Sequence, residues 1–313
     1  MPSSQQNRLE GLRAAPSHPI ALLLGFIATS LWASSFVLVK MALPYFGPMT
    51  IGGLRYFLGF LLLFPILYRR RRSKSRSHRP WFLLAAIGLS AYTLGNGAAF
   101  WALEYLTATA ASFAISTVPL FMLIIGAIHL AEIPTRGQIV GVFLGLLGAI
   151  LFFSPGFRPQ ELTGWAIILL GLVGFVTFGA LSREVARARN VGTVALTAYP
   201  LAIGGGGLLL IAAPLEGIPT APAAPWLIIL WLALVNTALA YILYNHALQT
   251  LTALEMSVML NLSPIGTAIL AWFLLDERIT FLQGVGIVVL VIAAFLVQHR
   301  RPRSTNQTPI SNP

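Results

Sequence analysis

Ten runs of predominantly apolar residues follow one another along the chain, separated by short polar segments. A run of about twenty such residues is long enough for a helix to cross a hydrocarbon core of about 30 Å. The runs cover residues 20–42, 48–68, 81–103, 106–130, 137–154, 163–182, 192–213, 225–247, 252–275 and 280–298. The pattern predicts an all-α integral membrane protein with ten transmembrane helices, which we number as spans 1 to 10.

One apolar segment occurs twice. Residues 106–119 read LTATAASFAISTVP, and residues 251–264 read LTALEMSVMLNLSP. The same offset of 145 residues pairs identical positions over nearly forty residues without a gap: Leu103 with Leu248, Ser112 with Ser257, Glu132 with Glu277, Thr135 with Thr280, Gln138 with Gln283 and Gly141 with Gly286. A match of this length at a constant offset indicates an internal duplication.

The duplication divides the chain into two halves of five spans. We expect a cytoplasmic tail at 1–19, a first repeat at 20–154, an external linker at 155–162, a second repeat at 163–298 and a second cytoplasmic tail at 299–313. Because five is odd, the second repeat enters the membrane in the opposite sense to the first. Inverted five-helix repeats of this kind build a central site near the membrane midplane in many secondary transporters.

Charged residues are rare and unevenly placed. Only 9% of the 313 residues are charged, against roughly 25% in a soluble domain, so this chain cannot cover a water-facing surface. With the N-terminus inside, sixteen of the twenty Lys and Arg residues fall in cytoplasmic segments, including the run RRRRSKSRSHR at 69–79. Lys40, Arg158 and Arg278 fall outside, and Arg55 lies within span 2. This bias predicts a protein of the cytoplasmic membrane with both termini in the cytoplasm.

The net charge of +11 raises the alternative of nucleic-acid binding, but the charges lie at the ends of spans, as expected of a membrane protein. The lipid bilayer is the expected partner, and the 69–79 run is placed to meet anionic headgroups. Nucleic acid is not an expected partner.

Three motifs carry a resemblance to a known family. They are LWASSF in span 1, LRYF in span 2, and the doubled block T-A-x(3)-S-x(6)-P-x(12)-E. With these motifs the chain resembles, over essentially its whole length, two repeats of the EamA family of the drug/metabolite transporter superfamily. The resemblance implies a ten-helix carrier with both ends inside and a cavity lined by spans 1, 3, 4, 6, 8 and 9. It says almost nothing about the substrate.

Both copies of the doubled segment end in a proline, which removes one backbone hydrogen bond and kinks a helix. In lipid the freed carbonyl needs a partner, so such a kink faces protein or a water-filled cavity. Small or polar residues lie on the face that leads into each proline: Ser112, Ser116 and Pro119 in span 4, and Ser257, Asn261 and Pro264 in span 9. We interpret these as substrate-binding hydroxyl and amide groups with gating prolines. The alternative is hydroxyl groups that join neighbouring helices.

Spans 3 and 8 each carry a polar stripe at matching positions. Tyr92 and Asn96 in span 3 correspond, at the 145-residue offset, to Thr237 and Tyr241 in span 8. Matching stripes in matching helices favour substrate binding. In span 1, Trp32 with Ser35 offers an aromatic face near hydroxyls, although an aromatic residue also commonly packs at a helix interface.

Two charged residues enter the spans. Arg55 in span 2 is placed either to meet an anionic substrate group or to snorkel toward the headgroups. The resemblance to the EamA family implies that an arginine at this position serves as a scaffold or gate rather than in the choice of substrate. Glu255 is a candidate proton carrier, since acids within the membrane are usually functional. However, Thr252-x-x-Glu255 also reads as a capping box, which we favour, and Thr135-x-x-Gln138 and Thr280-x-x-Gln283 read likewise.

The residues that enzymes need are scarce. The chain has no cysteine, and it lacks HExxH, GxSxG and a Walker lysine, so we expect no catalytic residue, no metal and no cofactor. The prediction is a secondary transporter, an exporter of small neutral, zwitterionic or weakly anionic metabolites such as amino acids. The alternative is a membrane protein that does not transport, either an enzyme or a receptor or scaffold.

Gly137, Gly141 and Gly145 allow close helix contact within one subunit or between two, so the sequence is compatible with both a monomer and a homodimer.

Overall fold

The computed structural model describes residues 16–71, 81–129, 135–156, 159–188, 193–251 and 253–298, which are helices joined by short turns and contain no strand. The first half comprises α2 (His18–Ala42), α3 (Pro48–Arg71), α4 (Trp81–Gly88), η1 (Leu89–Asn96), α5 (Gly97–Ala102), α6 (Ala108–Ile115), α7 (Val118–His129) and α8 (Arg136–Phe153). The second half comprises α9 (Pro159–Ala188), α10 (Thr193–Leu215), α11 (Ala223–Ala233), η2 (Leu234–Leu239), α12 (Ala240–Ala247), α13 (Ala253–Leu260), α14 (Ser263–Leu275) and α15 (Phe281–Gln298).

The helices are long and apolar enough for a membrane. Seven helical stretches in the described residues meet the length and hydropathy of a span, and three shorter apolar helices lie at 108–124, 263–275 and 281–297. Each apolar run predicted from the sequence is helical over most of its length. Large apolar side chains such as Phe82, Leu210 and Phe273 lie exposed on the outside of the bundle, as expected for contact with lipid tails.

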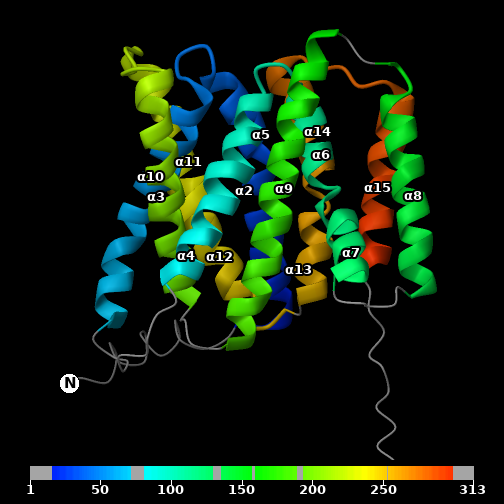
Figure 1. Cartoon of the computed structure of the whole chain (residues 1–313), viewed down its shortest axis with the longest axis horizontal. Coiled ribbons are helices and arrows are strands. Elements are labelled where there is room, and N and C mark those ends of the chain that lie inside the picture. Colours follow the sequence, from blue (N-terminus) through cyan, green and yellow to red (C-terminus); the bar gives the residue numbers. More distant parts are fainter. Residues whose placement is uncertain are drawn as a thin grey trace, which may run out of the picture.

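Figure 1 shows the helices running side by side in one bundle. α2 begins and α15 ends at the same end of the bundle, which we call the tail end. The turns at 43–47, 103–107 and 276–280 lie at the other, which we call the far end. Equivalent elements of the two halves begin at the predicted offset of 145 residues: α3 and α10 at 48 and 193, η1 and η2 at 89 and 234, α6 and α13 at 108 and 253, and α8 and α15 at 136 and 281.

The doubled segment forms two interrupted helices, where the sequence led us to expect kinked ones. A turn at 116–117 separates α6 from α7, and a turn at 261–262 separates α13 from α14. Pro119 and Pro264 are the second residues of α7 and α14, a position that suits proline because its missing N–H would find no partner there. The carbonyls four residues before them belong to Ile115 and Leu260, the last residues of α6 and α13. Each helix therefore ends where the proline would leave a carbonyl without its donor.

Spans 3 and 8 share a second irregularity, which no sequence pattern indicated. Each changes from α to π geometry at the same repeat position, in η1 and η2, and then returns to α geometry. π-helical turns are rare and occur most often at functional sites. The two segments therefore mark the middle of these spans as unusual in both halves.

Glycines bring several helices into close contact. A Cβ atom on Gly141 would lie 3.0 Å from the carbonyl oxygen of Ala293, and one on Gly148 would lie 2.9 Å from that of Gly286. Gly141 and Gly148 of α8 therefore pack on α15 within one subunit. Of the other predicted glycines, Gly145 faces Leu120 of α7, and a Cβ atom on Gly137 would meet no atom of the described residues within 4 Å. In the 204–207 run, a Cβ atom on Gly204 would clash with the carbonyl oxygen of Gly88, so this glycine lets α10 approach α4 closely.

Candidate functional site

A buried arginine joins span 2 to the π-helical segment of span 8. Arg55 on α3 is only 4% exposed. Its Nε donates to Thr237 Oγ1 at 2.9 Å, and its Nη2 donates to the carbonyl oxygen of Asn236 at 3.2 Å. The guanidinium also lies 5.2 Å from the ring centroid of Tyr56 and 5.7 Å from that of Phe100, within cation–π range. Arg55 does not snorkel toward the headgroups, because its side chain is directed into the protein.

Asn236 connects this arginine to span 1. Its Nδ2 lies within hydrogen-bond distance of Ser34 Oγ at 2.8 Å, of Ser35 Oγ at 3.2 Å and of the carbonyl oxygen of Leu31, and its two N–H groups are shared among these three acceptors. Because a carbonyl only accepts, the contact with Leu31 fixes which amide atom is the nitrogen. Asn236 is fully buried, and its Oδ1 has no hydrogen-bond partner. Asn236 therefore connects Ser35, one of the predicted site residues, to the surroundings of Arg55.

Aromatic side chains from spans 1, 3 and 8 meet next to Arg55 and Asn236. The hydroxyl groups of Tyr92 and Tyr241 are 2.8 Å apart and share a hydrogen bond. The ring of Trp32 lies 5.3 Å from that of Tyr241 and 5.2 Å from that of Tyr244. One residue of each predicted polar stripe, Tyr92 in span 3 and Tyr241 in span 8, thus meets the other, and Trp32 joins Tyr241 from span 1.

Ser116 and Asn96, two of the other predicted residues, bind the backbone of their own helical segments. At the first helix break, Ser116 Oγ donates to the carbonyl oxygen of Ser112 at 3.0 Å, and Ser112 itself is buried. Asn261 is buried at the second break, and the side chain of Ser257 lies outside the described residues. Asn96 Nδ2 donates to the carbonyl oxygen of Ala91 at 2.8 Å, so this amide binds the backbone of its own π-helical segment.

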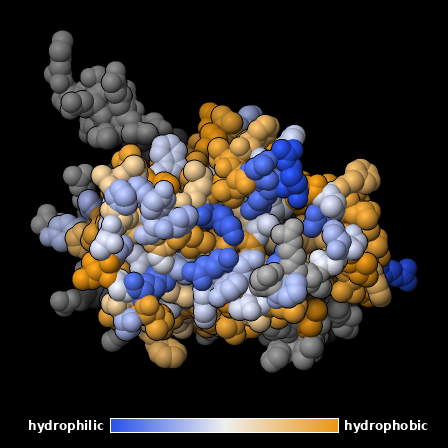
Figure 2. Space-filling view, turned by 90° about the horizontal axis from the view of Figure 1, so that it is seen from above, coloured by the Kyte–Doolittle hydropathy of each residue, from blue (hydrophilic) through white to orange (hydrophobic). Residues whose placement is uncertain are grey.

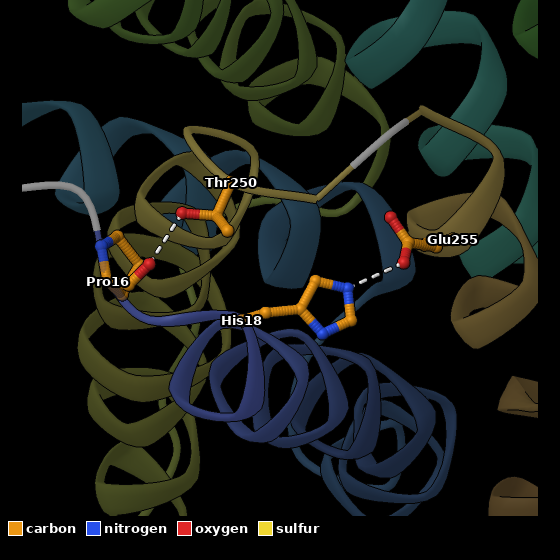
Figure 3. Close-up of polar contacts among 4 residues, drawn as sticks. All are labelled: Pro16, His18, Thr250 and Glu255. Carbon is orange, nitrogen blue, oxygen red and sulfur yellow. Dashed lines mark hydrogen bonds and ion pairs between the residues drawn. The ribbon is translucent and has the colours of Figure 1, made fainter.

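The predicted capping boxes at Thr135 and Thr280 are both present. Each threonine N–H donates to the glutamine Oε1 three residues later at 2.9 Å, and each glutamine N–H donates back to the threonine Oγ1. Thr252 lies outside the described residues, so the box that would include Glu255 is not described. Glu255 Oε1 instead lies 2.9 Å from His18 Nε2, and Thr250 Oγ1 donates to the carbonyl oxygen of Pro16 nearby (Figure 3). These contacts tie the start of α2 to spans 8 and 9 at the tail end.

The far end is tied by carboxylates that bind helix N-termini. Glu277 accepts hydrogen bonds from the backbone N–H of Ala108 at 2.7 Å and of Thr109 at 3.2 Å, at the start of α6. Glu216 accepts from the N–H groups of Met49 and Thr50, both at 2.8 Å, at the start of α3. Helix N-termini favour such negative charge. Glu277 thus caps α6, a helix of the other repeat.

Two hollows lie away from the central cluster. One, of about 320 Å³, opens at the far end between Thr109, Phe153, Trp165 and the 277–283 segment. Figure 2 shows hydrophilic residues gathered on this end face, with apolar residues around its rim. The other, of about 440 Å³, lies between α14 and α15 and is lined mainly by Ile, Ala and Val. Neither hollow is lined by the residues expected to bind a substrate.

The arrangement of two similar helical halves with matched breaks agrees with a comparison to known families. The model of the EamA-like transporter family matches residues 19–154 and again residues 159–298. The chain belongs to the EamA-like transporter family. It is a multi-pass membrane protein of a family of transporters and not an enzyme.

Relatives of this EamA protein cover nearly the same length. An uncharacterized transporter of Archaeoglobus fulgidus is 27% identical over 85% of this chain and 93% of its own. An S-adenosylmethionine/S-adenosylhomocysteine transporter of Chlamydia trachomatis is 25% identical over 88% of both chains. A probable terminal-alkyne amino-acid exporter of Streptantibioticus cattleyicolor is 25% identical over 86% of this chain and 90% of its own. A solved crystal structure superposes with a TM-score of 0.65 at 19% identity over 90% of this chain and 98% of its own, which establishes the fold alone.

Several residues of the cluster around Arg55 and Trp32 were not among the site residues predicted from the sequence. Asn236, Tyr56 and Phe100 complete the surroundings of Arg55, and Tyr244 completes the aromatic group around Trp32. A buried arginine needs acceptors and aromatic faces, so a search of the neighbouring spans for such groups would have included Asn236. Nothing in the sequence singled out the rings of Tyr56 and Phe100 among the other aromatic residues.

Proposed function

We propose that this chain is a secondary transporter that exports small neutral, zwitterionic or weakly anionic metabolites across the cytoplasmic membrane by alternating access. In this proposal ten spans form two inverted repeats, and both termini are cytoplasmic. The observation that carries it is the recurrence of two irregular elements, the helix break and the π-helical segment, at the same 145-residue offset in both halves. Broken helices in matched positions are the usual way in which inverted-repeat carriers build a central site.

The chemistry of the central cluster supports the substrate class. Hydroxyl groups, amides, aromatic rings and one arginine surround the π-helical segments. The acidic residues of the chain lie in the connecting segments or toward the ends of spans, so the middle of the bundle offers no carboxylate for an organic cation. The relatives named for S-adenosylmethionine and for amino acids agree with a small polar substrate.

Transport is tested with the purified protein in proteoliposomes. Vesicles loaded with a panel of labelled metabolites, with and without a pH gradient, should lose one or more of them faster than protein-free vesicles. Vesicles that contain Ser116→Leu or Asn261→Leu protein, in which bulk is added at a helix break, should lose the same compounds more slowly. Equal loss from all vesicles across the whole panel would refute the transporter proposal.

The orientation is tested separately in intact cells. Because the chain has no cysteine, single cysteines can be introduced at Lys74, in the basic run, and at Arg278, beside Glu277. A membrane-impermeant thiol reagent should label position 278 and leave position 74 unlabelled. The reverse labelling would contradict the proposed orientation.

A further inference from the structure

Arg55 is a buried charge with only neutral partners. The guanidinium has five N–H donors, and the structure gives acceptors to two N–H groups, one on Nε and one on Nη2. Neither acceptor is a carboxylate, and the ion pairs seen among the described residues, His18 with Glu255 and Arg278 with Asp276, do not include Arg55. A buried cation is costly unless an anion or several hydrogen bonds compensate for its lost hydration. The remaining N–H groups of the Arg55 guanidinium could therefore donate to a further acceptor that is an anion.

An unmet acceptor lies beside this cation. The residue whose carbonyl oxygen accepts from Arg55 Nη2 is Asn236, and the Oδ1 of the same residue is buried without a donor. Its Nδ2 is committed to span 1, so the amide cannot turn to exchange its two ends without losing those bonds. A buried carbonyl oxygen without a donor costs roughly 1–3 kcal/mol. Where α3 meets η2, Arg55 therefore presents a donor that lacks an anion, and Asn236 presents an acceptor that lacks a donor.

We infer that these two groups recognise the α-carboxylate and the α-ammonium of an amino-acid substrate, with Arg55 on the carboxylate and Asn236 Oδ1 on the ammonium. In an α-amino acid these opposite charges are attached to one carbon, so a single ligand satisfies both neighbouring groups. The half-buried rings of Trp32 and Tyr241 lie about one helical turn farther along α2 and span 8, where they would meet the substrate side chain. This inference rests on the proposed transport function and narrows its substrate.

The first experiment uses the wild-type protein and matched compounds. Proteoliposomes are loaded with the twenty proteinogenic L-amino acids, and efflux identifies the best substrate. Its N-acetyl derivative, its α-keto acid and its decarboxylated amine are then compared with it. Each derivative removes one charge of the zwitterion, so each should be transported at least about tenfold more slowly, as expected when a charge-assisted hydrogen bond is lost. Equal transport of the parent and any derivative overturns the assignment of the corresponding group.

The second experiment assigns the two residues. Arg55→Lys keeps the charge but loses the planar fork, and Arg55→Gln loses both. Both should reduce amino-acid efflux, Gln by about ten- to hundredfold, and should reduce the preference for the amino acid over its amine. Asn236→Ala should reduce the preference over the α-keto acid. The control is Lys40→Gln, because Lys40 donates to carbonyls at the far end and lies outside the cluster. It should leave both preferences unchanged whatever it does to the melting temperature.

A purely structural role gives a different result. If Arg55 and Asn236 only tie spans together, the variants will melt earlier while the folded fraction keeps the wild-type preferences, which would overturn the inference. Transport of other metabolites from the panel without any amino acid would also overturn it and leave the proposed function standing. Transport of no compound at all would refute both.

Discussion

The helices α6 and α13 are repeat mates of equal length, yet they are held in different ways. They begin at residues 108 and 253 and end at residues 115 and 260. The first turn of α6 donates its backbone N–H groups to Glu277, which arrives from the other repeat. The first turn of α13 carries its own acid, Glu255, whose side chain pairs with His18 on α2. At the positions of α6 and α9 that correspond to Glu255 and His18, the chain has Ala110 and Thr163, which cannot form such a pair.

The two ties differ in strength for a physical reason. Glu277 makes several charge-assisted hydrogen bonds to a helix N-terminus in a partly buried setting, and these are among the stronger polar contacts in proteins. The side chains of His18 and Glu255 are 55% and 35% exposed, and an exposed ion pair contributes about 0–1 kcal/mol. Both ties join the N-terminal half to the C-terminal half. The far end is therefore fastened more firmly than the tail end.

The largest expected effect comes from breaking the far-end tie. Glu277→Gln replaces a carboxylate that binds two backbone N–H groups and the Thr109 hydroxyl by a neutral amide. We expect a loss of about 1.5–3 kcal/mol in the free energy of unfolding, since hydrogen bonds to a charged group are lost or weakened. The measurement is thermal or denaturant unfolding of the purified protein. Asp276→Asn is the matched control, because Asp276 is exposed, pairs with Arg278 and tolerates asparagine at its positive φ. An equal loss in both variants would contradict the comparison.

The second prediction concerns the breaks that follow these helices. Ser116→Leu removes the hydroxyl that donates to the Ser112 carbonyl, whereas Asn261→Leu removes an amide that is 6% exposed. We expect Asn261→Leu to cost about 1–3 kcal/mol, because a polar side chain is lost from a buried position, and Ser116→Leu to cost less because its bond is local. Melting temperature and initial transport rate are measured on both variants. If Ser116→Leu melts earlier than Asn261→Leu, the first break is the more constrained one.

The tail-end tie should matter less. His18→Gln and Glu255→Gln are each expected to change the free energy of unfolding by no more than about 1 kcal/mol, and the effect should shrink in high salt. A double-mutant cycle isolates the pair from other contacts of either residue. A coupling energy near that of a buried pair, above about 2 kcal/mol, would remove the difference between the two ends. If transport by the Glu255→Gln variant no longer depended on pH while its stability stayed normal, Glu255 would instead be identified as a proton carrier.

The smallest effect is expected at Glu104, another acidic residue of the far end. Burial, together with the nearby carboxylate of Glu216, raises the pKa of Glu104 above its ordinary value of 4.5. The folded protein then binds this proton more readily than the unfolded chain, so charged Glu104 lowers stability above its folded pKa, and this cost disappears as the pH falls through it. Glu104→Gln should raise the melting temperature slightly near pH 7 and leave it unchanged well below pH 4.5. A decrease near pH 7 would contradict this sign.

Much of the fold followed from the sequence because its signals are local. A run of apolar residues forms a helix in lipid whatever its neighbours are, since each backbone hydrogen bond must be satisfied within the segment. The same holds for the capping boxes at Thr135 and Thr280, whose partners are three residues apart. The 145-residue offset also predicted the matched positions of the two breaks. It did not predict that they are breaks rather than kinks, because Pro65 and Pro200 lie inside continuous helices.

The contacts between the halves were decided only by the tertiary structure. Nothing local to residues 277 and 108 indicates that the carboxylate of one binds the N–H of the other, because that bond depends on how two distant helices pack. The same is true of Arg55 with Asn236 and of Tyr92 with Tyr241, which lie 181 and 149 residues apart in the chain. The sequence by itself determined the helices, the two capping boxes at Thr135 and Thr280, and the duplication. Only the packing of one half against the other placed the arginine, the asparagine and the aromatic rings in one cluster, since side-chain contacts of this kind depend on distances in space and not along the chain.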